Sequence, residues 1–112
     1  MLTLPIKKKW FDMIKSGEKK EEYREIKPYY TRRFENLVLC LSNLSQEDME
    51  YLCIKDDYNK TDIILRNGYS NNSPSIKCKV SISIGCGNHE WGAEPNKEYY
   101  VLKILSVEEV QE

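Results

Sequence analysis

The stretch from Ile76 to Ile84 alternates apolar and polar residues more regularly than any other part of the chain. Its apolar positions are Ile76, Cys78, Val80, Ile82 and Ile84. Successive side chains of a strand point to opposite faces of a sheet, so this period of two predicts a strand with one face in the core. The rest of the chain must supply the partners of this strand.

Shorter segments predict those partners. Strands are expected at residues 2–4, 18–26, 37–41, 63–65 and 99–107, and short helices at 5–16, 29–34 and 45–53. These elements do not alternate as regular β-α-β units, which favours an antiparallel or mixed sheet curled into a small barrel. The expected fold class is therefore α+β, mainly β, with about five or six strands and two or three short helices.

The first helix has a predicted beginning and end. Pro5 suits a first helical turn, whose N–H groups have no partner within the helix. An apolar stripe at spacings of three and four follows, formed by Ile6, Trp10, Met13 and Ile14. We expect Gly17 to end this helix in the left-handed conformation.

Size and composition indicate one globular unit. A chain of 112 residues has the usual size of a domain, so residues 1–112 are interpreted as a single domain. No apolar run approaches the roughly 20 residues of a membrane-spanning helix, and the N-terminus lacks the pattern of a signal peptide. These features favour a cytoplasmic protein with no membrane partner.

Cysteine and histidine do not indicate a metal. The four cysteines contain no CxxC pair, and His89 is the only histidine. Zinc needs several Cys, His or carboxylate ligands at suitable spacing, so no metal and no cofactor is expected. Cys86 and His89 fall in a glycine-rich loop and are interpreted as exposed residues.

Residues 18–26 are almost wholly charged. Such a strand is not explained by core packing, so it either lies at a sheet edge or pairs its charges in a cleft. Alternation would place Lys19 and Tyr23 on the face opposite Glu22 and Arg24. Residues 1–34 carry ten Lys and Arg against five Asp and Glu, although the whole chain has a net charge of −1. This basic part is suited to a polyanion, but a solvated helix face explains it equally well.

The residues Gly17, Lys19, Glu22 and Arg24 fit the pattern G-x-K-x-x-E-x-R of ASCH domains, a branch of the PUA-like superfamily, which this chain resembles. The segments Arg66-Asn67-Gly68-Tyr69 and Glu90-Trp91-Gly92-Ala93 are also similar to parts of small bacterial and phage-borne members. The resemblance spans nearly the whole chain. It implies a PUA-like β-barrel with a helix over a cleft, and it implies that the cleft binds RNA or nucleotides.

The residue types in this motif suit such a ligand. Arginine offers a bidentate fork and lysine a point charge to a phosphate, while a glutamate accepts from an amino group of a base. The candidate ligand-binding residues are Lys19, Glu22, Arg24, Tyr23, Tyr29, Arg32 and Trp91, in which the aromatic rings would stack on a base and Arg32 would contact a phosphate. The alternative is that Glu22 and Arg24 form a surface ion pair without a function.

A minority of ASCH domains are amidohydrolases that remove the acetyl group from acetylcytidine. In those enzymes a threonine stands at the place of Glu22, so this chain lacks their hydroxyl. The alternative function is therefore a metal-independent amidohydrolase in which Lys19 is the base and Glu22 orients a water. A third interpretation is a protein-interaction module that uses the tyrosine-rich segment at 29–34. We expect a binding domain rather than an enzyme.

Overall fold

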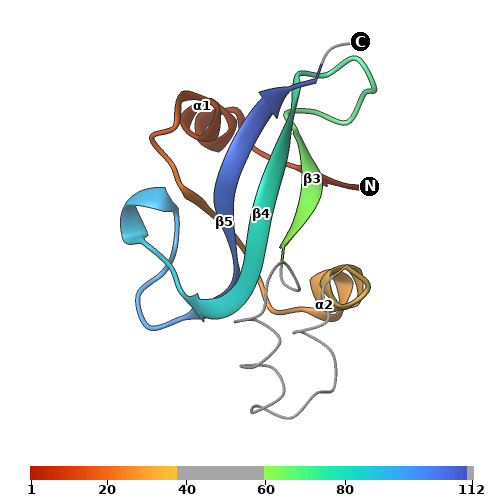
Figure 1. Cartoon of the computed structure of the whole chain (residues 1–112). Helices are drawn as coiled ribbons and strands as arrows, with labels where there is room; N and C mark the ends of the chain where they lie inside the picture. The colour runs from red at the N-terminus through yellow and green to blue at the C-terminus, as the bar shows by residue number, and fades with distance from the viewer. Residues whose placement is uncertain (38–59, 111–112) are drawn as a thin grey trace.

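One mixed sheet organises the chain, and a computed structural model describes residues 1–37 and 60–110 of it. Within these residues the sheet has five strands in the order β1-β3-β4-β5-β2 (Figure 1). The strands are β1 Leu2–Pro5, β2 Glu21–Arg24, β3 Lys60–Arg66, β4 Ser75–Cys86 and β5 Glu98–Glu109. β1 pairs with β3 in parallel, and all other pairs are antiparallel. The sheet curls into a half-barrel, and β1 and β2 are its edges among the strands of the described residues.

The alternation that predicted β4 is confirmed over most of its length. Ile76, Cys78, Val80 and Ile82 are fully or almost fully buried. Ile84 departs from the pattern with 49% of its surface exposed. It pairs with Tyr100 near the end of β4, beyond the last of the buried alternating positions. Strand β4 therefore continues beyond the residues that pack in the core.

Helix α1 begins later than the sequence predicted. It spans Lys8–Ser16, whereas Pro5 is the last residue of β1. The chain stays extended after Pro5 because the amide of Ile6 donates to the carbonyl of Arg66 at 3.0 Å, which continues the contact with the β3 side of the sheet. The predicted end is confirmed, since Gly17 has φ 87° and its amide donates to the carbonyl of Ile14.

Helix α2 spans Pro28–Glu35, with proline in its first turn, and confirms the helix predicted at 29–34. Its Phe34 is fully buried and meets the ring of Tyr100 edge to face, with 5.0 Å between the ring centroids. The two helices lie at opposite ends of the sheet (Figure 1). A short 3-10 turn, His89–Trp91, lies in the connection from β4 to β5.

The structure confirms the expected class, a small α+β chain that is mainly β, and it contains five strands and two α-helices within the described residues. Most of the strand predicted at 37–41, the helix predicted at 45–53, and Cys40 and Cys53 lie outside those residues. Neither described helix has the length and apolar character needed to cross a membrane.

Candidate functional site

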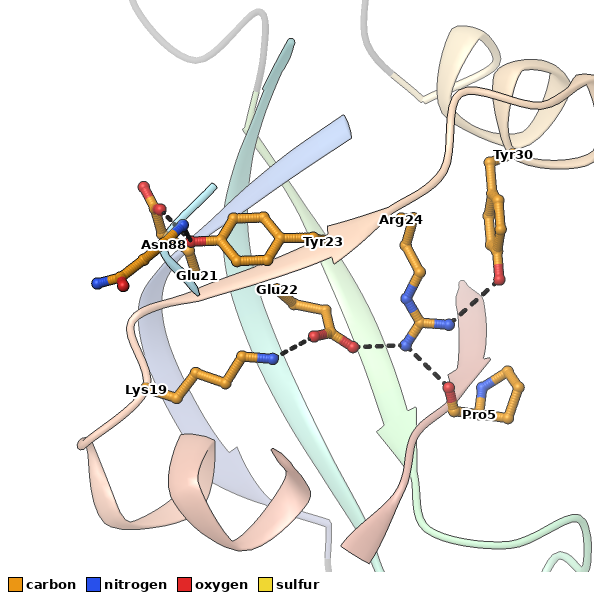
Figure 2. A network of polar contacts seen from close by, with 8 residues as sticks. All are labelled: Pro5, Lys19, Glu21, Glu22, Tyr23, Arg24, Tyr30 and Asn88. Atoms are coloured by element: carbon orange, nitrogen blue, oxygen red, sulfur yellow. Dashed lines mark hydrogen bonds and ion pairs between the residues drawn. The ribbon is translucent and has the colours of Figure 1, made fainter. Parts of the chain in front are cut away.

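Three charged side chains of the sequence motif form one buried network, which we call the ion network: Lys19, Glu22 and Arg24. The amine of Lys19 donates to Oε1 of Glu22 at 2.5 Å, and Nη2 of Arg24 donates to Oε2 of the same carboxylate at 2.7 Å (Figure 2). Lys19 is 1% exposed and the side chain of Arg24 is 11% exposed. One carboxylate therefore separates two buried cations.

The turn after α1 brings Lys19 to this carboxylate. Strand β2 begins only at Glu21, so the predicted alternation was wrong for Lys19, which precedes the strand. The amide of Lys19 donates to the carbonyl of Met13 at 2.9 Å, which folds the chain back against α1. Its amine lies 4.6 Å from the ring centroid of Trp10. A cation held against an aromatic face and a carboxylate is partly compensated for its loss of water.

Arg24 connects the two edges of the half-barrel. Its Nη2 also donates to the carbonyl of Pro5, the last residue of β1, at 2.8 Å. Its Nη1 donates to the hydroxyl of Tyr30 in α2 at 3.3 Å. β2 and β1 are the two ends of the sheet order, so the bond to Pro5 joins strands that do not pair with each other (Figure 2). Its Nε is buried without a hydrogen-bond partner among the described residues.

Burial and pairing act in opposite directions on these cations. Burial lowers the pKa of Lys19, Glu22 opposes the effect, and the nearby positive charge of Arg24 adds to it. Burial would also lower the pKa of Arg24, but the carboxylate of Glu22 and the hydroxyl of Tyr30 outweigh it, so the pKa is raised. Arg24 is therefore a permanent cation, while Lys19 is the member of the network that loses its proton more easily than usual.

A pocket of about 740 Å³ lies between the two helices and the ends of β1 and β2. Its aromatic lining consists of Trp10, Tyr23, Tyr30, Tyr69, Trp91 and Tyr99. Its charged lining consists of Glu22, Arg24, Glu25 and Glu94, with three lysines that we call the pocket lysines, Lys7, Lys27 and Lys97. This volume and this mixture of rings with a few polar groups are typical of small-molecule sites.

The structure brings four of the predicted site residues to this pocket: Glu22, Tyr23, Arg24 and Trp91. Lys19 is not among the lining residues, because it is buried beside Glu22. Tyr29 and Arg32 do not line the pocket either. Helix α2 packs Phe34 into the core and presents Tyr30 to the pocket, which leaves Tyr29 and Arg32 exposed.

Tyr23 holds one wall of the pocket in place. Its hydroxyl donates to Oε1 of Glu21 and accepts from the amide of Asn88, both at 2.7 Å (Figure 2). Asn88 caps the 3-10 turn that carries Trp91. Burial raises the pKa of Tyr23 to about 12, the amide of Asn88 opposes this, and Glu21 adds to it. Tyr23 therefore positions a neighbouring loop in addition to lining the pocket.

The sequence patterns did not identify several further lining residues, among them Lys7, Tyr69 and Lys97. Tyr69 had a local signal, because it follows Asn67-Gly68, a pair typical of turns, and an aromatic residue beside a turn is readily exposed. Lys7 and Lys97 had no distinctive pattern, since Lys7 belongs to a run of three lysines at 7–9 and Lys97 is a single lysine in a lysine-rich chain.

The arrangement offers a permanent cation, carboxylates, aromatic faces and lysine amines around one space. Comparison of the chain with models of protein families, with curated proteins and with solved structures finds no match.

Proposed function

We propose that this protein binds RNA or a nucleotide in the pocket beside the ion network. The observation that carries the proposal is the pocket itself, in which Arg24 and Glu22 lie among six aromatic side chains. The resemblance of the Gly17–Arg24 motif to ASCH domains supports this proposal, and we further propose a relationship to the PUA-like superfamily on the same ground.

The chemistry of the lining supports a nucleotide. Aromatic rings stack on the faces of bases with little preference for sequence, each contributing about 1–3 kcal/mol. Both oxygens of Glu22 accept one bond within the network, but a carboxylate oxygen has further acceptor capacity for the amino group of a base. Among the pocket lysines, Lys7 is an exposed cation available to a phosphate. Lys27 and Lys97 lie 3.4–3.9 Å from the carboxylates of Glu25 and Glu94.

The size of the pocket supports a ligand of one nucleotide or slightly more. Sites for small molecules and cofactors usually have volumes of about 300–1,000 Å³. The pocket, at about 740 Å³, lies within this range. A duplex would not fit in such a space, so an RNA ligand would enter as a single strand.

Titration of the protein with the four ribonucleoside monophosphates, followed by calorimetry at low and moderate salt, tests this proposal. Arg24→Lys retains a positive charge but loses the fork that bonds Glu22, Pro5 and Tyr30 beside the pocket, and we expect it to weaken binding by about tenfold or more. Arg33→Lys is the matched control, because Arg33 lies outside the pocket, and its affinity should equal that of the wild type. Absence of binding by the wild type, or equal binding by Arg24→Lys, would contradict the proposal.

The lowered pKa of Lys19 favours the alternative function, an amidohydrolase acting on a modified nucleoside such as acetylcytidine. A lysine with a lowered pKa is a better general base near neutral pH. Against this function, the amine is buried and already paired with Glu22. Incubation of acetylcytidine with stoichiometric wild-type protein and with Lys19→Met tests it. Product from the wild type alone would support hydrolysis, and no product from either would reject it.

A further inference from the structure

Tyr69 differs from every other aromatic residue of the pocket. It lines the pocket, yet 94% of its surface is exposed. The other five lining aromatics are buried or half-buried. Within the described residues its side chain makes no hydrogen bond and no ring contact. Its ring is therefore free to be covered by a ligand that extends beyond the pocket.

The backbone that carries Tyr69 is held firmly. The amide of Asn67 donates to the carbonyl of Pro74 at 2.9 Å, and its side-chain nitrogen donates to the carbonyl of Ile6 at 3.0 Å. Gly68 has φ 128°, and a Cβ there would lie 2.4 Å from Oγ of Ser73. Only glycine fits this position without strain, so the turn fixes the direction in which the chain reaches Tyr69.

An exposed ring on a fixed backbone is prepared for binding. Aromatic side chains bury about 150–250 Å² when covered, and most of this area is apolar. Little backbone entropy is lost on binding because the turn is already ordered. The ring of Tyr69 therefore offers a stacking surface outside the space enclosed by the inner aromatic residues.

A cation lies on the same side of the pocket. The bond from Asn67 to Ile6 places the Asn67–Tyr69 turn next to the segment that contains Lys7. Lys7 is exposed and also lines the pocket. A phosphate that joins a base inside the pocket to a base on Tyr69 would pass a region of positive charge.

We propose that Tyr69 stacks on a second base, so that the preferred ligand is a dinucleotide step of single-stranded RNA rather than a free mononucleotide. The first base lies among the inner aromatic residues, the linking phosphate lies near Lys7, and the second base covers the ring of Tyr69. This inference rests on the proposed function, since it requires that the pocket binds a nucleotide.

Calorimetry with three kinds of ligand tests the inference: the four ribonucleoside monophosphates, their homodinucleotides, and the same dinucleotides with the second base removed. We expect the wild type to bind a dinucleotide about 5- to 150-fold more tightly than its abasic form, as stacking on one ring predicts. Tyr69→Ala should remove this difference, so that a dinucleotide binds to it no more tightly than the abasic form. Tyr69→Phe keeps the ring and should retain the difference.

The outcomes separate the two proposals. If Tyr69→Ala binds mononucleotides and still prefers a dinucleotide to its abasic form as strongly as the wild type does, Tyr69 does not stack on the second base. That result would overturn the inference and leave the proposed function standing. An equal loss of mononucleotide and dinucleotide affinity in Tyr69→Ala would assign Tyr69 to the first base and also overturn the inference. No binding of any ligand by the wild type would overturn both.

Discussion

Two arginine–tyrosine pairs in this protein have different surroundings. Arg24 reaches Tyr30 while it also binds the carboxylate of Glu22, and its side chain is 11% exposed. Arg33 lies 3.5 Å from the ring centroid of Tyr29 and donates to the carbonyl of the same residue at 2.7 Å. The first pair connects β2, β1 and α2, whereas these contacts of the second pair stay within α2. The same residue types thus have different roles according to whether they meet a buried carboxylate.

Loss of the buried Arg24 contacts should lower the stability of the fold much more than loss of the Arg33 contacts. Charges removed from water are stable only while they are paired, and loss of one partner leaves an uncompensated buried charge. Contacts of exposed cations contribute about 0–1 kcal/mol. Substitutions in the ion network should therefore affect folding strongly. Substitutions on the outer side of α2, which we define as Tyr29, Arg32 and Arg33 because they do not line the pocket, should not.

The largest effect is expected for Glu22→Gln. It removes the carboxylate shared by Lys19 and Arg24, and we expect the free energy of unfolding to fall by about 3–5 kcal/mol. Arg33→Ala is the comparison on the outer side of α2 and should cost about 1 kcal/mol or less. Urea denaturation measures both. A Glu22→Gln protein as stable as Arg33→Ala would remove the distinction between the two regions.

A smaller effect is expected from the titration of Tyr23. Its pKa is raised to about 12 from the ordinary value of 10.0. Between these values the unfolded chain loses the phenolic proton while the folded protein keeps it, so this contribution to stability is complete below pH 10 and is lost as the pH rises towards 12. Two pKa units correspond to about 2–3 kcal/mol.

Comparison of the wild type with Tyr23→Phe isolates this titration from that of Lys19 and other groups. The stability advantage of the wild type over Tyr23→Phe should shrink as the pH increases from 10 to 12. Denaturation curves at closely spaced pH values measure the advantage. A constant difference in stability across this range would show that the hydroxyl of Tyr23 is not buried and hydrogen-bonded to Glu21 and Asn88.

Glycine substitutions beside the Asn88 turn should have the smallest effect. A Cβ on Gly87 would lie 2.6 Å from Cβ of Ala93 and 2.7 Å from the ring of Tyr23. Overpacking of this kind costs about 1–3 kcal/mol, so Gly87→Ala should be destabilised by that amount. Gly85→Ala is the matched control, because nothing lies within 4 Å of its Cβ position. Equal thermal stability of the two variants would contradict the packing of this wall against Tyr23.

Local signals in the sequence predicted the elements that local interactions form. The alternation from Ile76 identified β4, and Gly17 ended α1 as expected because one left-handed residue terminates a helix. Pro5 was misassigned, because its preference for a first helical turn competes with the extension of β1 along β3. Whether Pro5 joins a helix or a strand depended on β3, whose Arg66 lies about 60 residues later in the sequence.

The candidate site was predictable only in part for the same reason. The charged motif indicated Glu22 and Arg24, and both line the pocket. The bond from Arg24 to Pro5 spans 19 residues and that from Tyr23 to Asn88 spans 65, and both depend on the curvature of the sheet. No local period encodes that curvature. The sequence likewise did not distinguish Tyr30, which faces the pocket, from Tyr29 beside it.

The most direct test of the central claim is a titration of isotope-labelled protein with ribonucleotides, followed by NMR chemical shifts. We expect the indole signals of Trp10 and Trp91 and the amide signals of Glu22 and Arg24 to shift together, because these residues line one pocket. The amide signals of Arg32 and Arg33 should stay in place. Shifts confined to Tyr29, Arg32 and Arg33, with the pocket signals unchanged, would contradict the claim and place binding on the outer side of α2.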